Sequence, residues 1–249
     1  MKRFVLFLGL LLNLPAALAA GNLADVQIRD RVSGRVLPVY QSDGRWFVAG
    51  RPGREFRIEF RNRDARDLLA VVSVDGVNVV TGETAASSQG GYVVNAGGSL
   101  SISGWRKSLD NVAAFYFTNL EDSYAARTGR PENAGVIGVA VFRRKAEPEP
   151  LADLAPQAPM GSAMERDASR GARAESSPEK KSLGTGHGRV ESSRARYVEF
   201  ERESESPSEV IAIHYDTHAN LVARGVIREK RAWPAPFPGG FVADPPSRG

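Results

Sequence analysis

Residues 55–61 read Glu-Phe-Arg-Ile-Glu-Phe-Arg, and this strict alternation decides the fold class. Successive side chains of a β-strand point to opposite faces, so Phe56, Ile58 and Phe60 share one face while the charged residues share the other. A strand with one apolar and one charged face is typical of an antiparallel sheet that covers a core on one side. The segment therefore predicts an all-β protein.

The sequence on both sides of this segment extends the prediction. Residues 68–74 are almost continuously apolar and predict a central strand; Asp75-Gly76 then favours a two-residue type I′ hairpin turn, after which residues 77–80 return antiparallel. Only residues 122–126 look helical in this part of the chain. Together these features predict an antiparallel β-sandwich, jelly-roll-like in general form, of about ten short strands. The remaining strands are expected at residues 26–29, 35–40, 45–48, 91–94, 99–102, 113–118 and 136–142.

The first residues carry the pattern of a cleavable export signal. A basic start is followed by an apolar run that is too short to span a bilayer, and Ala17-Leu18-Ala19 has the small-x-small form of a cleavage site. Residues 1–19 are therefore predicted to be a signal peptide. The expected location is the periplasm or the exterior of the cell, with no transmembrane segment after the signal is removed.

The rest of the chain divides by composition. Residues 20–145 form the predicted sandwich domain, and residues 146–185, which lack aromatic side chains, are predicted to be a disordered linker. Residues 186–228 contain predicted strands at 195–200 and 209–215 and a helix at 217–224 with Asp216 or Thr217 as its N-cap. A segment of this length rarely folds alone, and we therefore expect it to dock on the sandwich and complete it. A Pro-rich tail occupies residues 229–249.

Composition excludes several classes of protein. The 249 residues include no cysteine, so no disulfide and no cysteine-linked lipid contributes to an exported form, and the core must carry the stability. The formal net charge is only +4 and the basic residues form no dense stripe, which argues against a nucleic-acid partner. A thiol nucleophile is likewise excluded.

One cluster has the residue types of a metal site. His214, Asp216 and His218 would share a face if the chain stayed extended, and two histidines with a carboxylate can bind zinc or iron. The opposing interpretation is that a helix begins at this point, which separates the three side chains and uses Asp216 as a cap. We assign no catalytic residue and expect no cofactor.

Two polar-aromatic segments are candidates for ligand recognition. Trp105 with Arg106, and Tyr124 with Arg127, could form a patch for a glycan or a peptide carboxylate, because loops on a rigid scaffold often carry binding residues. The competing interpretation is that both aromatic rings fill the end of the sandwich. A third segment, Gly-Thr-Gly-His-Gly at residues 184–188, lacks the features of a phosphate-binding loop and is interpreted as a flexible return into the fold.

Several strings of the sequence resemble a known family. They include Val-Val-Ser-Val-Asp-Gly-Val-Asn-Val-Val at residues 71–80, Gly-Trp-Arg at residues 104–106, and the stretches at residues 91–94, 123–129 and 133–142. Together they are similar to a family of exported proteobacterial proteins of unassigned function; residues 196–226 resemble its C-terminal part. The resemblance implies one fold unit made of both ordered segments, and it implies no activity, cofactor or catalytic residue.

The sequence thus favours a non-catalytic binding or interaction module of the cell envelope, whose partner is an envelope protein or a glycan. The alternative is a metal-dependent hydrolase that uses His214, Asp216 and His218 to activate water. A further possibility is an accessory part of a surface structure, in which a partner strand pairs with an exposed sheet edge. The oligomeric state is left open.

Overall fold

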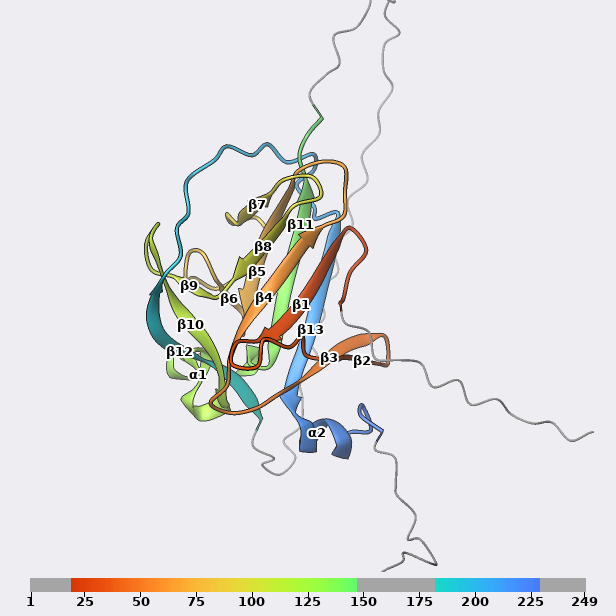
Figure 1. Ribbon diagram of the computed structural model, residues 1–249, viewed down its shortest axis with the longest axis vertical. Helices are drawn as coiled ribbons and strands as arrows, with labels where there is room; N and C mark the ends of the chain where they lie inside the picture. Colours follow the sequence, from red (N-terminus) through yellow and green to blue (C-terminus); the bar gives the residue numbers. More distant parts are fainter. Residues whose placement is uncertain (1–18, 147–181, 229–249) are drawn as a thin grey trace, which may run out of the picture.

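The computed structural model describes residues 19–146 and 182–228 (Figure 1). The predicted signal peptide, all but its last residue, lies outside the described residues, as do most of the predicted linker and the Pro-rich tail. Within the described residues, no helix is both long enough and apolar enough to cross a membrane.

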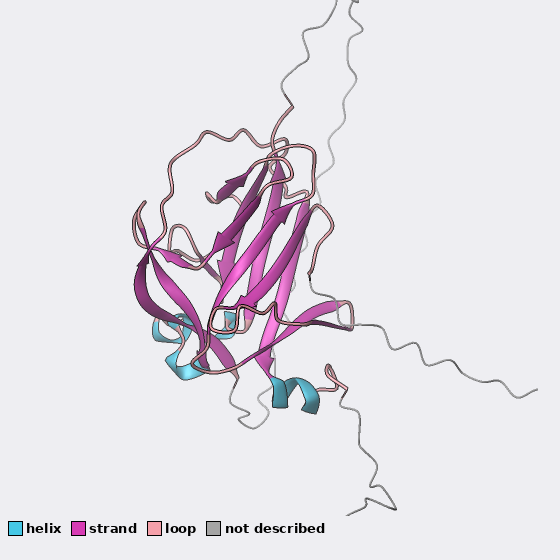
Figure 2. Ribbon diagram, in the orientation of Figure 1, coloured by secondary structure: helices cyan, strands magenta, loops and turns pink. Residues whose placement is uncertain are grey.

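Two β-sheets make up the described part of the chain, as the sequence predicts (Figure 2). In the first sheet, β1, β4, β10 and β12 are hydrogen-bonded in that order, β8 pairs with β4 and β9 pairs with β10, all antiparallel. The strands are β1 (Ala24–Asp30), β4 (Glu55–Asn62), β8 (Ser99–Ile102), β9 (Gly104–Arg106), β10 (Asn111–Asn119) and β12 (Leu183–Ser192).

The second sheet has the order β2-β3-β13-β11-β5-β6, with β7 paired to β5. Its strands are β2 (Val39–Ser42), β3 (Arg45–Gly50), β5 (Leu68–Val74), β6 (Val77–Asn78), β7 (Tyr92–Val94), β11 (Val136–Arg143) and β13 (Glu209–Thr217). The pairing of β3 with β13 is parallel, which departs from the purely antiparallel expectation. A parallel pair is possible here because the two strands are far apart in the sequence and need no tight turn between them.

The core lies between the two sheets. Phe56, Ile58 and Phe60 of β4 are buried, as their alternation predicts, and Phe56 stacks on Phe115 and Phe117 with ring centroids 5.3 and 4.3 Å apart. The predicted hairpin turn is also present: Asp75 and Gly76 have φ values of 52° and 72°, the positive values that a type I′ turn requires at both central positions.

The C-terminal segment completes both sheets. β12 forms the edge of the first sheet beyond β10, and β13 is inserted between β3 and β11 of the second. The prediction of a strand at residues 195–200 is wrong: these residues contain no strand, and the strand before β13 is β12 at Leu183–Ser192. The Gly-rich residues 184–188 therefore form a strand rather than a flexible loop. A Cβ at position 186 would lie 2.1 Å from Cζ of Tyr116, so any larger residue there would have to displace that ring.

The helices are short. One turn, α1 (Tyr124–Arg127), lies close to its predicted position, between the 3-10 turns η1 (Leu120–Asp122) and η2 (Pro131–Asn133). The second, α2 (His218–Ala223), begins after β13, and the side chain of Thr217 rather than Asp216 caps it by accepting a hydrogen bond from Asn220 N at 3.1 Å. It covers Phe47 on the outer face of the second sheet.

Candidate functional site

The three residues of the predicted metal site are separated by the start of α2. His214 lies on β13 with its ring 5.5 Å from that of Phe47, and His218 is exposed as the first residue of the helix. Asp216 accepts hydrogen bonds from Asn220 Nδ2 at 2.8 Å and from Thr217 N at 2.7 Å. Across the described ranges, no group of three or more His, Cys, Asp or Glu side chains is placed to hold a metal ion. Desolvation by burial, together with Arg45 and Arg224, lowers the pKa of His214.

The four residues of the predicted recognition patch are divided between two places. Trp105 is only 3% exposed and packs edge-on against Phe115, with ring centroids 4.7 Å apart. Tyr124 lies half-buried beside it at 5.1 Å, and Arg127 projects from α1 into solvent. Trp105 and Tyr124 therefore fill the space between the sheets, in line with the competing interpretation of the sequence, while Arg106 contributes to a separate groove.

A buried polar network of Asp75, Thr185 and Tyr215 joins the two sheets. Asp75 accepts hydrogen bonds from Tyr215 OH at 2.6 Å, Thr185 N at 2.7 Å and Gly135 N at 2.9 Å, and the hydroxyl groups of Thr185 and Tyr215 are 2.6 Å apart. Burial raises the pKa of Asp75 to about 6 even though these hydrogen bonds act in the opposite direction. None of Asp75, Thr185 and Tyr215 lines the large groove beside residues 193–202, so we assign this network to stability.

Residues 193–202 follow β12 and run as a loop along the outside of the sandwich before the chain enters β13 (Figure 1). We call this loop the strap. The first end of the strap is fixed by Arg106, whose Nη1 donates a hydrogen bond to the carbonyl oxygen of Ser193 at 2.6 Å. Two backbone hydrogen bonds also hold this end: Ser193 N donates to Asp110 O at 2.6 Å, and Ala195 N donates to Leu109 O at 2.7 Å. Arg106 is thus an anchor of the strap.

The second end of the strap is held by an apolar contact and two further arginines. Phe200 packs on Leu69, Val71 and Phe142 of the outer face of the second sheet, and the guanidinium of Arg144 lies 4.6 Å from the centroid of its ring. Arg202 donates to the carbonyl of Gln89 at 2.6 Å and lies over the Phe142 ring at 4.1 Å. The strap is therefore tied down at both ends.

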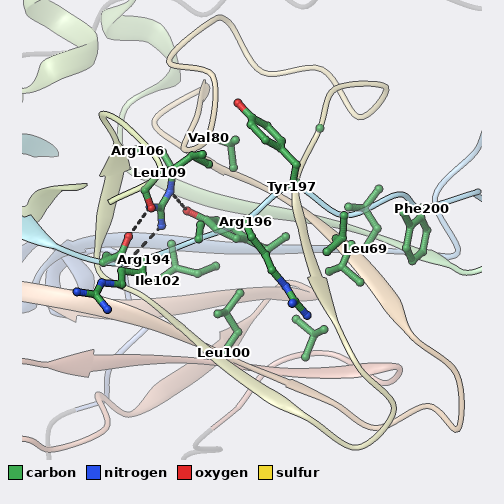
Figure 3. Close-up of a pocket in the computed structure, with 18 of the residues that line it drawn as sticks. Leu69, Val80, Leu100, Ile102, Arg106, Leu109, Arg194, Arg196, Tyr197 and Phe200 are labelled. Carbon is green, nitrogen blue, oxygen red and sulfur yellow. Dashed lines mark hydrogen bonds between the residues drawn. The ribbon is translucent and has the colours of Figure 1, made fainter. Parts of the chain in front are cut away.

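The middle of the strap is free of such contacts. Among the described residues, positions 196–198 take part in no backbone hydrogen bond, and Tyr197 is 90% exposed. Beneath and beside this stretch lies a groove of about 1070 Å³, bounded on its other sides by β7 and β8. Figure 3 shows Arg196 directed into this strap groove toward Leu100, while Tyr197 extends the other way.

The charged side chains in the described lining of the strap groove are all cationic. Its described lining includes six cationic side chains and no aspartate or glutamate; the cations are Arg106, Lys107, Arg144, Arg194, Arg196 and Arg202. Of these, Arg144 is paired with Asp67 at 3.3 Å, and Arg106 and Arg202 bind backbone carbonyls. Lys107, Arg194 and Arg196 form no ion pair with any described residue. Leu69, Val80, Leu100 and Ile102 supply apolar surface between the charges.

Sequence reasoning found only Arg106 of this groove and missed the strap. A usable signal was present in Arg-Ala-Arg-Tyr at residues 194–197, where two cations and an aromatic residue follow one another closely, but we interpreted that stretch as a strand. Comparison of the chain with protein-family models, with curated proteins and with solved structures finds no match.

Proposed function

We propose that this protein is a non-catalytic binding module of the cell envelope that holds an elongated, negatively charged ligand in the strap groove. The observation that carries the proposal is the charge of the groove, six Lys and Arg side chains with no carboxylate among its described lining residues. The envelope location belongs to the same proposal. It depends on the signal-like start of the chain and on the resemblance to a family of exported proteins.

The size and chemistry of the groove support binding. Its volume of about 1070 Å³ is slightly above the range of about 300–1,000 Å³ that is typical of ligand sites. Guanidinium groups bind carboxylates and phosphates through two parallel hydrogen bonds, and three cations of the groove have no such partner within the described chain. Apolar side chains between the cations would bury the uncharged parts of the same ligand.

The lining also favours binding over proton transfer. Apart from its cations, the described part of the groove is lined by serine and threonine, by glycine and Asn95, by Tyr92 and Tyr197, and by apolar side chains. A general base near neutral pH is most often a histidine or a carboxylate, and His187, His214 and Asp75 all lie outside this lining.

The proposal is tested by titrating the protein with fluorescein-labelled poly-L-glutamate and with labelled dextran sulfate, using neutral dextran as the reference. We expect at least one anionic polymer to bind, with affinity that falls as salt is raised. Lys107→Glu combined with Arg196→Glu reverses two unpaired charges of the groove and should weaken binding at least tenfold.

Arg51→Glu is the control for a charge reversal outside the groove; it changes the net charge by −2, half of the −4 of the double variant. Arg51 is an exposed arginine in the connection between β3 and β4, at the opposite end of the sandwich from the strap (Figure 1). Its reversal changes the net charge in the same direction and should leave binding within twofold of the wild type. Absence of binding by both anionic polymers would refute the proposal, and so would equal losses in the groove variant and the Arg51 variant.

A further inference from the structure

The strap groove contains a free strand edge. β8 pairs with β4 on one side only, and its register places Leu100 opposite Phe60 and Ser101 opposite Glu59. Asn62 N donates to Gly98 O at 2.8 Å, and this bond fixes which residues of β8 direct their backbone groups toward β4. Residues 100 and 102 therefore direct their N–H and C=O groups toward β4, whereas Ser99 and Ser101 direct theirs to the opposite edge.

The neighbouring strand β9 differs from β8, because the chain that follows β6 pairs with it. Immediately after β8, Arg106 N donates to Val79 O at 2.7 Å, so that β9 of the first sheet is joined directly to the chain that follows β6 of the second. No corresponding bond reaches β8 from the described residues, although Ser99 and Ser101 line the strap groove. An unpaired strand edge offers a row of donors and acceptors to another chain.

We propose that the ligand of the strap groove is an extended acidic peptide segment of another protein, which adds to β8 as an antiparallel or parallel strand. This inference depends on the proposed function and specifies its ligand class. The main chain of the peptide pairs with Ser99 and Ser101. Because side chains of a strand alternate, one set of peptide side chains lies on the face of Leu100, toward which Arg196 is directed, and the other lies on the exposed face of Ser99 and Ser101.

The free edge is the reason for choosing a peptide over an anionic glycan. The outward groups of Ser99 and Ser101 are two residues apart, about 7 Å along the strand, which is the repeat of an adjacent polypeptide strand. Strand addition of this kind obtains affinity from main-chain hydrogen bonds and selectivity from alternate side chains. The absence of carboxylates from the described groove lining then selects acidic rather than basic segments.

The test uses a labelled peptide of eight residues, acetyl-(Glu-Val)₄-amide, measured by fluorescence anisotropy against the full chain. Three competitors are compared: the same sequence methylated on every backbone nitrogen, a (Lys-Val)₄ peptide, and unlabelled dextran sulfate. We expect the (Glu-Val)₄ peptide to bind and the methylated and lysine peptides to compete at least tenfold less well.

A pair of substitutions at one position isolates the strand edge. Ser101→Pro removes an N–H that points away from β4, so the ladder between β4 and β8 keeps its hydrogen bonds, and proline is tolerated at such edge positions. Ser101→Ala retains the N–H and serves as the control. We expect the proline variant to bind the peptide at least tenfold more weakly and the alanine variant within twofold of the wild type, with both melting near the wild-type temperature.

The outcomes separate this inference from the proposed function. Equal binding of the methylated and unmethylated peptides, or equal binding by the proline and alanine variants, would overturn strand addition. If dextran sulfate binds in the groove and the peptide does not, the peptide inference fails while the proposed function stands. If no anionic probe binds, both fail.

Discussion

The two ends of one side of this sandwich are built differently. At one end, which we call the sealed end, Asp75, Thr185 and Tyr215 bind one another across the sheets, and Trp105 is buried against Phe115 and Tyr124. At the other end, the strap groove has unpaired cations and the free edge of β8. The same two sheets border both regions.

The difference shows where a binding function can reside in a fold of this kind. At the sealed end, the Asp75 carboxylate and the hydroxyls of Thr185 and Tyr215 already have partners inside the protein, so a ligand would have to displace them at a cost. At the strap groove, Lys107, Arg194 and Arg196 form no ion pair with any described residue, so a ligand gains their interactions without such a loss. Changes at the sealed end should therefore alter stability, and changes at the groove should alter binding.

The largest expected effect is at Trp105. Trp105→Ala removes a buried indole that contacts Phe115 and Tyr124, and it should lower the free energy of unfolding by about 3–5 kcal/mol. Tyr197→Ala removes a ring that is 90% exposed and should change it by less than about 0.5 kcal/mol. Urea titration of both variants gives the values, and similar losses in the two would break the contrast between the sealed end and the strap.

The second effect concerns the pH dependence of the sealed end. Burial raises the pKa of Asp75 from 3.8 to about 6, so between these values the folded state binds a proton that the unfolded state has released. The contribution of Asp75 to stability is therefore full below about pH 4 and decreases as the pH rises through 6. The size of this loss is about 3 kcal/mol.

Asp75→Asn tests this directly. The amide does not titrate, so the stability of the wild type relative to the variant should fall as the pH is raised from 4 to 7. Acids with lowered pKa, such as Asp30 beside Arg54, remain in both proteins and cancel in the comparison. Parallel pH profiles for the two proteins, measured by urea unfolding, would show that Asp75 is not protonated in this range.

The third effect is at the anchored end of the strap. Phe200→Ala removes the ring that packs on Leu69, Val71 and Phe142, and we expect a loss of about 1–2 kcal/mol. Amide exchange in residues 193–202 should accelerate, while exchange in β4 and β10 should remain unchanged once it is corrected for the loss of global stability. Unchanged exchange in the strap would show that Phe200 is not what fixes it.

Much of the fold was predictable from the sequence because its signals are local. The alternation at residues 55–61 and the Asp75-Gly76 turn each specify their own structure, and both are present. Two features were not predictable in this way. The parallel pairing of β3 with β13 depends on contacts between residues far apart in the chain, and β12 is rich in glycine, which has low strand propensity.

The candidate site was less predictable for a related physical reason. Trp105 and Arg106 are adjacent on β9, and strand geometry directs them to opposite sides, so one enters the core and the other reaches the strap. The three cations without partners come from β9–β10 and from the strap, which are about ninety residues apart; only the sheet order brings them together. Sequence spacing alone therefore could not assemble this groove.

The smallest expected effect is a charge removal in the strap groove. Arg196 has no ion-pair partner in the described chain and shares the groove with other cations, so Arg196→Gln should relieve repulsion rather than break a contact. We expect the free energy of unfolding at low salt to rise slightly, by less than about 0.5 kcal/mol, and the gain to vanish in high salt. Arg54→Gln is the contrasting change, because Arg54 binds both oxygens of Asp30 at 2.8 and 2.9 Å and its loss should destabilise. A clear loss of stability in Arg196→Gln would mean that this arginine supports the fold and would remove one of the charges on which ligand binding is proposed to depend.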